Sequence, residues 1–318
     1  MNPTRRYALG VLSASLFLGP AIAAEPFSIV ATTGMIADAA KRVGGDLADV
    51  KALMGPGIDP HAYRQTRTDI VAMTRADLVL AHGLYLEAQM TGFLEDLGRK
   101  TPVVAVADGL QTALLRPSGD YEDRFDPHVW MNPGLWAHVV DAITNALVQT
   151  RPEARATFMA NADRYKAELA QLDQYMLDVL AKVPEPARVL LTAHDAFGYF
   201  GQAYGFEVLG IQGISTESEA GLARISELVD VLVARDIKAV FVETSVSDRN
   251  IRALIEGAEA KGHRVRLGGA LFSDAMGPQG SYEGTYIGMM DHNATTIARA
   301  LGADISSGGM SGRLAIGG

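Results

Sequence analysis

Two copies of the tripeptide Asp-Pro-His are the residues of this chain best suited to chemistry. One copy is Asp59–His61 and the other is Asp126–His128. Proline fixes its own φ angle and biases the residue before it toward an extended form, so each imidazole follows a stiff stretch of chain. Imidazole nitrogens held in this way are good ligands for transition metals. We therefore expect His61 and His128 to be metal ligands.

Two further polar residues, His194 and Asp274, each follow an apolar run that predicts a buried strand. In an open α/β sheet, ligands bind outside the carboxyl ends of the strands. Three imidazoles and one carboxylate suit a four-coordinate zinc ion, and a carboxylate that binds through both oxygens would make manganese acceptable. Iron(II) is a third option. The structural alternatives stay open, namely that His194 is a core histidine and that Asp274 caps the turn before Gly277.

A zinc hydrolase is a rival from a different functional class. Three histidine ligands with an open fourth position also serve hydrolytic zinc. Against this, the chain has no His-Glu-x-x-His motif, and Asp274 would close the fourth position. The general base would then have to be Glu217 or Glu243.

The elements that must position these residues alternate between short apolar runs and amphipathic stretches. Strands are predicted at residues 27–32, 47–54, 76–81, 102–106, 188–192, 206–209, 239–243 and 265–267. Helices are predicted at residues 34–43, 86–97, 133–148, 195–203, 218–235, 248–261 and 284–301. This alternation predicts an α/β protein with two Rossmann-like lobes, each a mostly parallel sheet covered by helices.

One uninterrupted helical pattern separates the two lobes. Between Pro152 and Val183 there is no glycine or further proline, and apolar residues recur with helical spacing. They are Phe158, Tyr165, Leu169, Leu172, Met176, Val179 and Val183. A helix over residues 152–183 would span about 45 Å at 1.5 Å per residue. We therefore predict a single long rigid helix that joins the lobes, with the metal site in the cleft between them; an isolated coiled-coil segment is the alternative.

Composition sets limits on the class of protein. The chain has 318 residues, of which 48% are hydrophobic and 20% are charged, as in soluble globular proteins with room for two domains. Cysteine is absent, which excludes disulfides, Cys-ligated metals, a thiol nucleophile and lipid attachment at an N-terminal cysteine. The formal net charge of −9 argues against nucleic acid as a partner, because phosphate contacts need a basic face.

The N-terminus has the pattern of an export signal. Arg5 and Arg6 precede an apolar stretch at residues 8–22, and Ala21–Ala23 fits the small-x-small cleavage rule. We predict cleavage near Ala24 and export to the periplasm, with the Sec and Tat routes both open. A membrane anchor is the alternative, although the stretch is short for a span of about 20 residues. Cleavage would remove two arginines and no acid, which takes the net charge to −11.

Six sequence stretches taken together carry a family resemblance. They are GIDPHAY, DPHVWMNP, LTAHDAFGYF, GISTESE and LFSDAMG with SYEGTYIGM after it. Through them the chain, from about residue 27 to residue 301, resembles the metal-specific periplasmic solute-binding proteins of ABC transporters for zinc and manganese. The resemblance implies two α/β lobes joined by one rigid helix. It also implies metal ligands at His61, His128, His194 and Asp274, where many manganese receptors have Glu at the third position.

The resemblance also implies a function and partners. The protein would be no enzyme but a monomeric receptor that captures a metal ion, zinc before manganese, and delivers it to an ABC permease in the inner membrane. Some family members have been described as surface adhesins, a reading that the soluble exported form disfavours. The chain departs from the family in lacking a lipid-bearing cysteine and in having no histidine at residues 116–125, where many zinc receptors carry a zinc-collecting loop.

These observations define an expected domain organisation. The expected segments are a signal peptide at residues 1–23, a first lobe at 24–151, a linking helix at 152–183, a second lobe at 184–303 and a flexible tail at 304–318.

Overall fold

The first lobe is built on a four-stranded parallel sheet with the order β2-β1-β3-β4. The computed structural model describes residues 26–119, 123–218 and 220–314, so the expected signal peptide at residues 1–23 lies outside the described residues. The strands of the first lobe are β1 (Phe27–Ala31), β2 (Ala48–Ala52), β3 (Leu78–Ala81) and β4 (Val103–Ala105). All four residues of the central strand β3 are buried, as its continuous apolar run requires.

Four α-helices accompany this sheet. They are α1 (Gly34–Gly44), α2 (Arg67–Arg75), α3 (Thr91–Leu97) and α4 (Pro133–Thr150). The sequence pattern did not predict α2, because only Asp69 and Met73 of this helix are buried. Thr66 and Asp69 are nevertheless a sequence signal for the start of this helix, because they form a capping box. The Thr66 hydroxyl accepts a hydrogen bond from the Asp69 amide, and the Asp69 carboxylate accepts one from the Thr66 amide.

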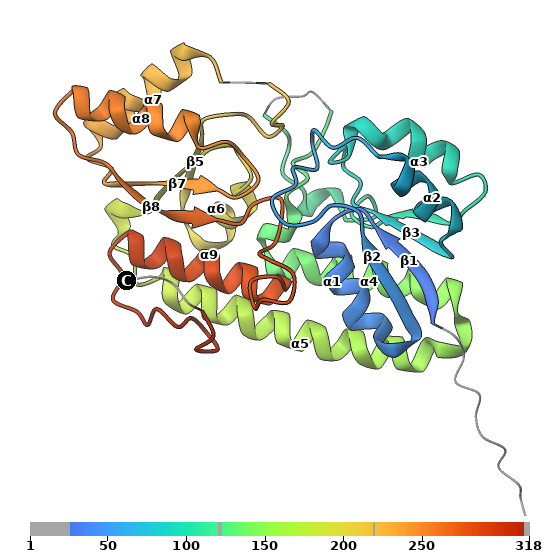
Figure 1. The fold of residues 1–318 in the computed structure, drawn as a ribbon. Coiled ribbons are helices and arrows are strands. Elements are labelled where there is room, and N and C mark those ends of the chain that lie inside the picture. The colour runs from blue at the N-terminus through green and yellow to red at the C-terminus, as the bar shows by residue number, and fades with distance from the viewer. Residues whose placement is uncertain (1–25, 120–122, 219, 315–318) are drawn as a thin grey trace, which may run out of the picture.

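The second lobe contains two parallel strand pairs, β5 with β6 and β7 with β8. The strands are β5 (Val189–Thr192), β6 (Glu207–Gly210), β7 (Ala239–Glu243) and β8 (Arg266–Leu271). Because β5 and β7 contact each other, the pairs lie in one layer (Figure 1). The α-helices of this lobe are α6 (Gly198–Tyr204), α7 (Leu222–Ala234), α8 (Arg249–Ala260) and α9 (Tyr286–Ala300).

Strand β8 is longer than the pattern at residues 265–267 predicted. Gly268 and Gly269 follow the predicted end of the strand, but in the structure they belong to it. The pairing register shifts there, because Val240 pairs with Leu267 and Phe241 pairs with Gly269. Gly269 has a φ angle of 145°, which a residue with a side chain rarely adopts. The strand therefore ends at Leu271, three residues before Asp274.

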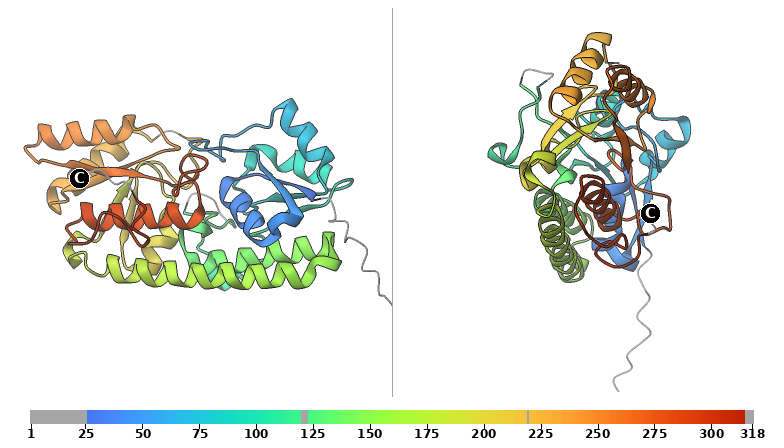
Figure 2. Two further views of the ribbon diagram at one scale, coloured as in Figure 1. Left: turned by 60° about the horizontal axis from the view of Figure 1, so that its bottom comes forward. Right: turned by 90° about the vertical axis from the view of Figure 1, so that its left-hand side faces the viewer.

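Helix α5 (Arg155–Leu180) runs beneath both lobes (Figures 1 and 2). It packs against α1 and α4 of the first lobe and against α9 of the second. All seven apolar residues of the predicted stripe are buried. The helix is shorter than residues 152–183, because a 3₁₀ turn at Pro152–Ala154 precedes it and a turn follows Leu180. The fold class predicted from the sequence, two α/β lobes joined by one long helix, is confirmed.

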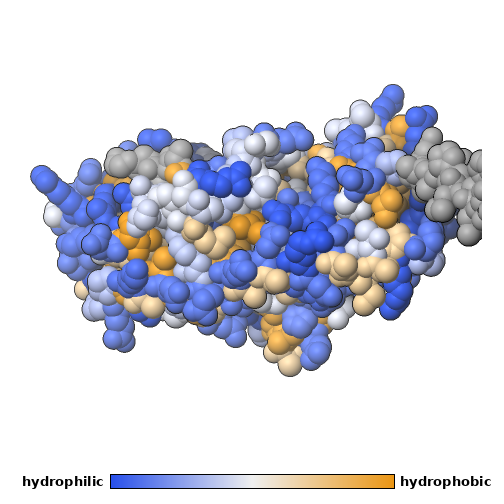
Figure 3. Space-filling model, turned by 90° about the horizontal axis from the view of Figure 1, so that it is seen from below, coloured by the Kyte–Doolittle hydropathy of each residue, from blue (hydrophilic) through white to orange (hydrophobic). Residues whose placement is uncertain are grey.

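Polar contacts also fix α5 to each lobe. The Asn161 amide donates to the backbone oxygen of Val43 at 2.9 Å in the first lobe. Tyr175 shares a hydrogen bond of 2.8 Å with Thr295 on α9 in the second lobe. The face seen from below, where α5 lies, is largely hydrophilic with smaller apolar areas (Figure 3). The helix therefore has one side in the core of both lobes and the other in water.

The segment after residue 303, which we expected to be a flexible tail, is packed as far as Leu314. The Met310 amide donates to the carboxylate of Asp291 on α9, and the Leu314 side chain is buried. Gly309 has a φ angle of 71°, and a Cβ there would lie 2.5 Å from Asp291. The glycines that suggested disorder thus allow the backbone to approach this carboxylate. Across the described residues, no helix combines the length and apolar character needed to cross a membrane.

Candidate metal centre

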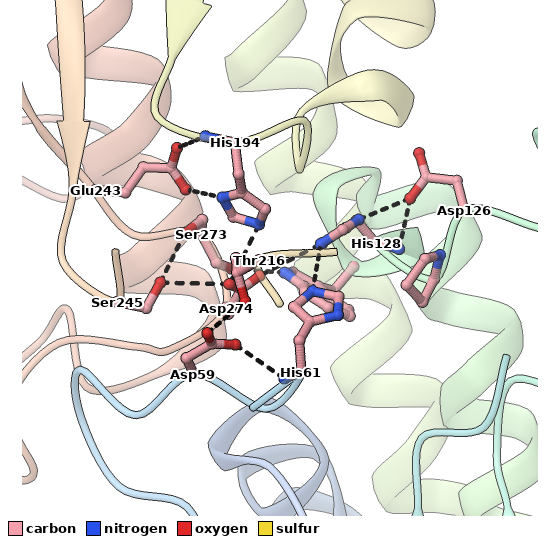
Figure 4. A network of polar contacts seen from close by, with 12 residues as sticks. Asp59, His61, Asp126, His128, His194, Thr216, Glu243, Ser245, Ser273 and Asp274 are labelled. Atoms are coloured by element: carbon pink, nitrogen blue, oxygen red, sulfur yellow. Dashed lines mark hydrogen bonds and ion pairs between the residues drawn. The ribbon is translucent and has the colours of Figure 1, made fainter. Parts of the chain in front are cut away.

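His61, His128, His194 and Asp274 meet in the cleft between the lobes (Figure 4). His61 lies in the loop between β2 and α2, and His128 lies just before α4; both belong to the first lobe. His194 follows β5 and Asp274 follows β8, at the carboxyl ends of strands in the second lobe. All four side chains are buried, and one ligand atom from each lies within 4.8 Å of the others.

The spacing of these atoms suits a single transition-metal ion. The Nε2 atoms of His61 and His128 lie 3.3 Å apart. The Oδ1 atom of Asp274 lies 3.4 Å from His128 Nε2, and its Oδ2 atom lies 3.2 Å from His194 Nε2. Ligands placed tetrahedrally at about 2.0–2.1 Å from zinc are separated by about 3.3–3.4 Å. Because each oxygen of Asp274 faces a different imidazole, the carboxylate is also placed to bind through both oxygens.

The two Asp-Pro-His motifs share one local hydrogen bond. In each, Oδ1 of the aspartate accepts a hydrogen bond from the backbone amide of the histidine, at 2.8 Å from His61 to Asp59 and at 3.0 Å from His128 to Asp126. This local bond ties the aspartate side chain to the backbone two residues further on. Each copy of the tripeptide therefore holds its histidine in a loop from which the imidazole points into the cleft.

Two buried carboxylates orient two of the imidazoles. His128 donates from Nδ1 to Oδ1 of Asp126 at 2.7 Å. His194 lies with Nδ1 at 2.5 Å from Oε2 of Glu243, whose other oxygen accepts from the His194 amide at 2.9 Å. A carboxylate on Nδ1 keeps the proton on that nitrogen and orients the ring so that Nε2 faces the site, where a metal would displace any proton that Nε2 carries. These two roles were not predicted from the sequence. The Asp-x-His spacing is a signal for the role of Asp126, whereas nothing in the sequence connects Glu243 with His194.

The carboxylates change the proton affinity of the imidazoles. Burial opposes the charged form of His128, but Asp126 and Asp274 outweigh burial and raise its pKa to about 9. For His194, Asp274 and Glu243 likewise outweigh burial and raise the pKa well above its usual range. Burial lowers the pKa of His61 to about 3. Burial also opposes ionisation of Asp274, but His194 and His128 hold its pKa well below the usual range. The site is therefore an ionised carboxylate facing imidazoles.

Four other polar residues contribute no ligand atom to this cluster. Glu217, one of the two possible general bases, is exposed and accepts a hydrogen bond from Gln89. The other, Glu243, is held against His194. His82 is buried with Nε2 at 2.7 Å from the Pro127 carbonyl oxygen, and His138 is exposed on α4.

Two lobes with a buried site between them are the arrangement of solute-binding proteins, and the nitrogen and oxygen donor atoms in that site suit a transition-metal ion. The sequence profile of the family described as zinc-uptake complex component A, periplasmic, matches residues 29–300. The chain therefore belongs to this family, which confirms the resemblance predicted from its motifs.

Two relatives illustrate the similarity. The chain is 47% identical over 277 residues to the manganese-binding lipoprotein MntA of Bacillus subtilis, covering 87% of this chain and 90% of the relative. It is 43% identical over 273 residues to the zinc-binding protein TroA of Treponema pallidum, covering 86% and 88%. These relatives are named as binding proteins, and several in the family are named as lipoproteins.

Solved structures share the fold. The periplasmic zinc-binding protein TroA of Treponema pallidum matches with a TM-score of 0.84 at 42% identity, over 87% of this chain and 99% of that one. A manganese-bound periplasmic metal-binding protein from Candidatus Liberibacter asiaticus matches with a TM-score of 0.74 at 21% identity, over 86% and 99%, and at that identity it supports the fold alone.

Proposed function

We propose that this chain captures a divalent transition metal and delivers it to an ABC permease in the inner membrane. In this proposal the metal ligands are His61, His128, His194 and Asp274. The observation that carries it is the approach of four ligand atoms from two lobes to within 4.8 Å of one another in a buried site. Membership of the family supports the transport role.

We propose zinc as the preferred metal and manganese as the second. Three imidazole nitrogens and a carboxylate favour zinc over manganese in the intrinsic affinity order. Manganese remains acceptable because Asp274 is placed to bind through both oxygens, which gives a fifth contact. Relatives of similar identity are named for each metal, so their names do not decide between them.

A competitive titration tests this proposal. The protein would be purified without added metal, analysed for bound elements, and titrated with zinc and with manganese against a chelator of known affinity. We expect one ion per chain, with zinc bound more tightly than manganese. A protein that binds neither ion, or that prefers calcium, would contradict the proposal.

We propose that the metal is cargo and that the site performs no hydrolysis. Four protein ligands leave little room for the bound water that hydrolytic zinc needs. The contact between Glu243 and His194 supports this view, because a carboxylate held on a ring nitrogen is not free to act as a general base. Hydrolysis of esters or peptides by the zinc-loaded protein at a rate that falls with Glu243→Gln would contradict it.

We further propose export to the periplasm as a monomer, after cleavage near Ala24 and without a lipid. The proposed segments are a signal peptide at residues 1–23, a first lobe at 24–151, a linking segment at 152–183 that contains α5, a second lobe at 184–303, and a C-terminal segment at 304–318 that packs on α9 as far as Leu314. Arg5 and Arg6 before an apolar stretch, together with the absence of cysteine, support cleavage without lipid attachment. The intact mass of the protein from a periplasmic extract would test it, and a mass that retains residues 1–23 would contradict it.

A further inference from the structure

The loop between β6 and α7 reaches across the cleft beside the metal centre. The hydroxyl of Thr216 in this loop donates to Oδ2 of Asp59 in the first lobe at 2.5 Å. The next residue, Glu217, accepts a hydrogen bond from the Gln89 side chain, which also belongs to the first lobe. Two adjacent residues of the second lobe therefore hold the first lobe through side-chain hydrogen bonds.

The Asp59 carboxylate connects this loop to a proposed metal ligand. Its Oδ1 atom accepts from the backbone amide of His61 at 2.8 Å, while its Oδ2 atom accepts from Thr216 (Figure 4). One carboxylate thus bonds to the backbone of His61 and to the opposite lobe. The matching aspartate of the second motif, Asp126, uses its Oδ1 atom for both the backbone and the ring of its own histidine.

His61 depends on this connection more than the other imidazoles do. Asp126 and Glu243 fix the rings of His128 and His194 through Nδ1. Within residues 26–119, 123–218 and 220–314, no carboxylate accepts a hydrogen bond from the ring of His61. Apart from the contact of its Nε2 atom with His128 Nε2 at 3.3 Å, His61 is held by the hydrogen bond from its backbone to the Asp59 carboxylate.

A small cavity shows what the loop covers. It has a volume of about 40 Å³, and its lining includes His61, Tyr85, Pro127, Ile214 and Glu217. One wall is therefore formed by the β6–α7 loop and another by the proposed ligand His61. Movement of the loop away from the first lobe would widen this cavity toward His61 and release the Asp59 carboxylate.

We propose that Thr216 is a positioning residue that couples His61 to the second lobe through Asp59, so that this contact slows the release of bound metal. The inference rests on the proposed metal-binding function and adds a determinant of its kinetics. Thr216 touches no metal; it acts by holding Asp59 while the lobes are together. A hydrogen bond to a charged group is strong enough for its loss to change a rate by about tenfold or more.

Stopped-flow measurement of zinc dissociation into excess chelator tests this proposal on the full exported chain. We expect Thr216→Val to release zinc about tenfold faster than the parent, with little change in the association rate. Thr216→Ser keeps the hydroxyl and should restore slow release. Thr74→Val is the matched control, because Thr74 is exposed on α2 and bonds only within its own helix. Gln89→Ala should also speed release, through loss of the contact with Glu217.

A double-mutant cycle tests whether Thr216 acts on zinc dissociation through Asp59. In an Asp59→Ala background, Thr216→Val should change the dissociation rate by less than about twofold, because the contact that it removes is already lost. Equal dissociation rates for the parent and Thr216→Val, or an undiminished effect in the Asp59→Ala background, would overturn the inference. Absence of zinc binding by the parent would instead overturn the proposed function, so the two failures are distinguishable.

Discussion

The Nε2 atom of His128 lies 3.4 Å from Oδ1 of Asp274, although the two residues belong to different lobes. Each side chain is buried, and each has its own support: Asp126 holds the His128 ring, and Ser245 lies 3.4 Å from Oδ2 of Asp274. An ion bound between His128 and Asp274 would therefore connect the two lobes directly. The free energy of metal binding would then stabilise the arrangement in which the two lobes lie against each other.

Removal of any one ligand should weaken zinc binding strongly while the fold survives. We expect a loss of at least about 100-fold for each truncation, because outer-sphere changes alone cost about 10- to 100-fold. The variants are His61→Ala, His128→Ala, His194→Ala and Asp274→Ala. Competition titration measures the affinities, and His138→Ala on the exposed face of α4 is the matched control. A variant that binds zinc as tightly as the parent removes that residue from the ligand set.

Zinc should raise the melting temperature by linkage. At a free zinc concentration of about 100 times the dissociation constant, the free energy of unfolding rises by about 2.7 kcal/mol. Scanning calorimetry of the parent should show a clear upward shift, whereas Asp274→Ala should show little. A shift of equal size in both proteins would mean that zinc stabilises the fold from another site.

The carboxylates of Asp126 and Glu243 should strengthen zinc binding although neither is a proposed metal ligand. Asp126→Asn and Glu243→Gln keep the size of each side chain but remove the negative charge that orients and polarises the ring. We expect each to weaken zinc binding by about 10- to 100-fold. Asp163→Asn, a change of the same kind at an exposed position on α5, should leave the affinity unchanged. If Glu243→Gln also leaves the zinc affinity unchanged, the contact between Glu243 and His194 contributes to the fold and not to metal binding.

Metal binding should release protons at neutral pH. The pKa of His128, raised to about 9, means that its ring carries a second proton at pH 7, which a metal on Nε2 must displace. Asp274 and Glu243 shift the pKa of His194 in the same direction. At least one proton should therefore leave per zinc ion near pH 7, and affinity should keep rising as pH approaches about 9. Calorimetry in buffers of different ionisation enthalpy counts these protons. An unperturbed histidine would give a plateau above about 6.5, and that result would contradict the role of the carboxylates.

Much of the fold and the candidate ligand cluster could be predicted from the sequence, because both depend on local patterns. The apolar stripe that ends at Val183 predicted which side of α5 is buried, and the Asp-Pro-His repeat indicated two of the four clustered residues. The position of His194 and Asp274 at the carboxyl ends of parallel strands indicated the other two. These features need no knowledge of distant contacts.

The remaining features depend on contacts between residues far apart in the chain. Glu243 meets His194 only because β7 lies beside β5, and Thr216 meets Asp59 only when the lobes face each other. The packed segment after residue 303 was misjudged because its glycines, which suggest disorder, serve a close approach to Asp291. Tertiary contacts of this kind leave no periodic signal in the sequence.

The long helix should limit the movement of the lobes. Helix α5 has 26 residues and one face buried along both lobes, so bending it would expose core residues such as Leu169. We expect zinc to change the radius of gyration little, with the rearrangement confined to loops near the cleft. Small-angle scattering of the metal-free and zinc-loaded protein measures this. A large decrease on adding zinc would show hinge closure and contradict the role of α5 as a rigid support.

The central claim is that three imidazoles and one carboxylate from two lobes hold the transported ion. A crystal structure of the zinc-loaded protein, with anomalous data collected at the zinc edge, tests it most directly. We expect one strong anomalous peak at about 2.0–2.2 Å from the Nε2 atoms of His61, His128 and His194 and from an oxygen of Asp274. A peak elsewhere in the molecule, or an ion held by three histidines and a water with Asp274 turned away, would contradict it.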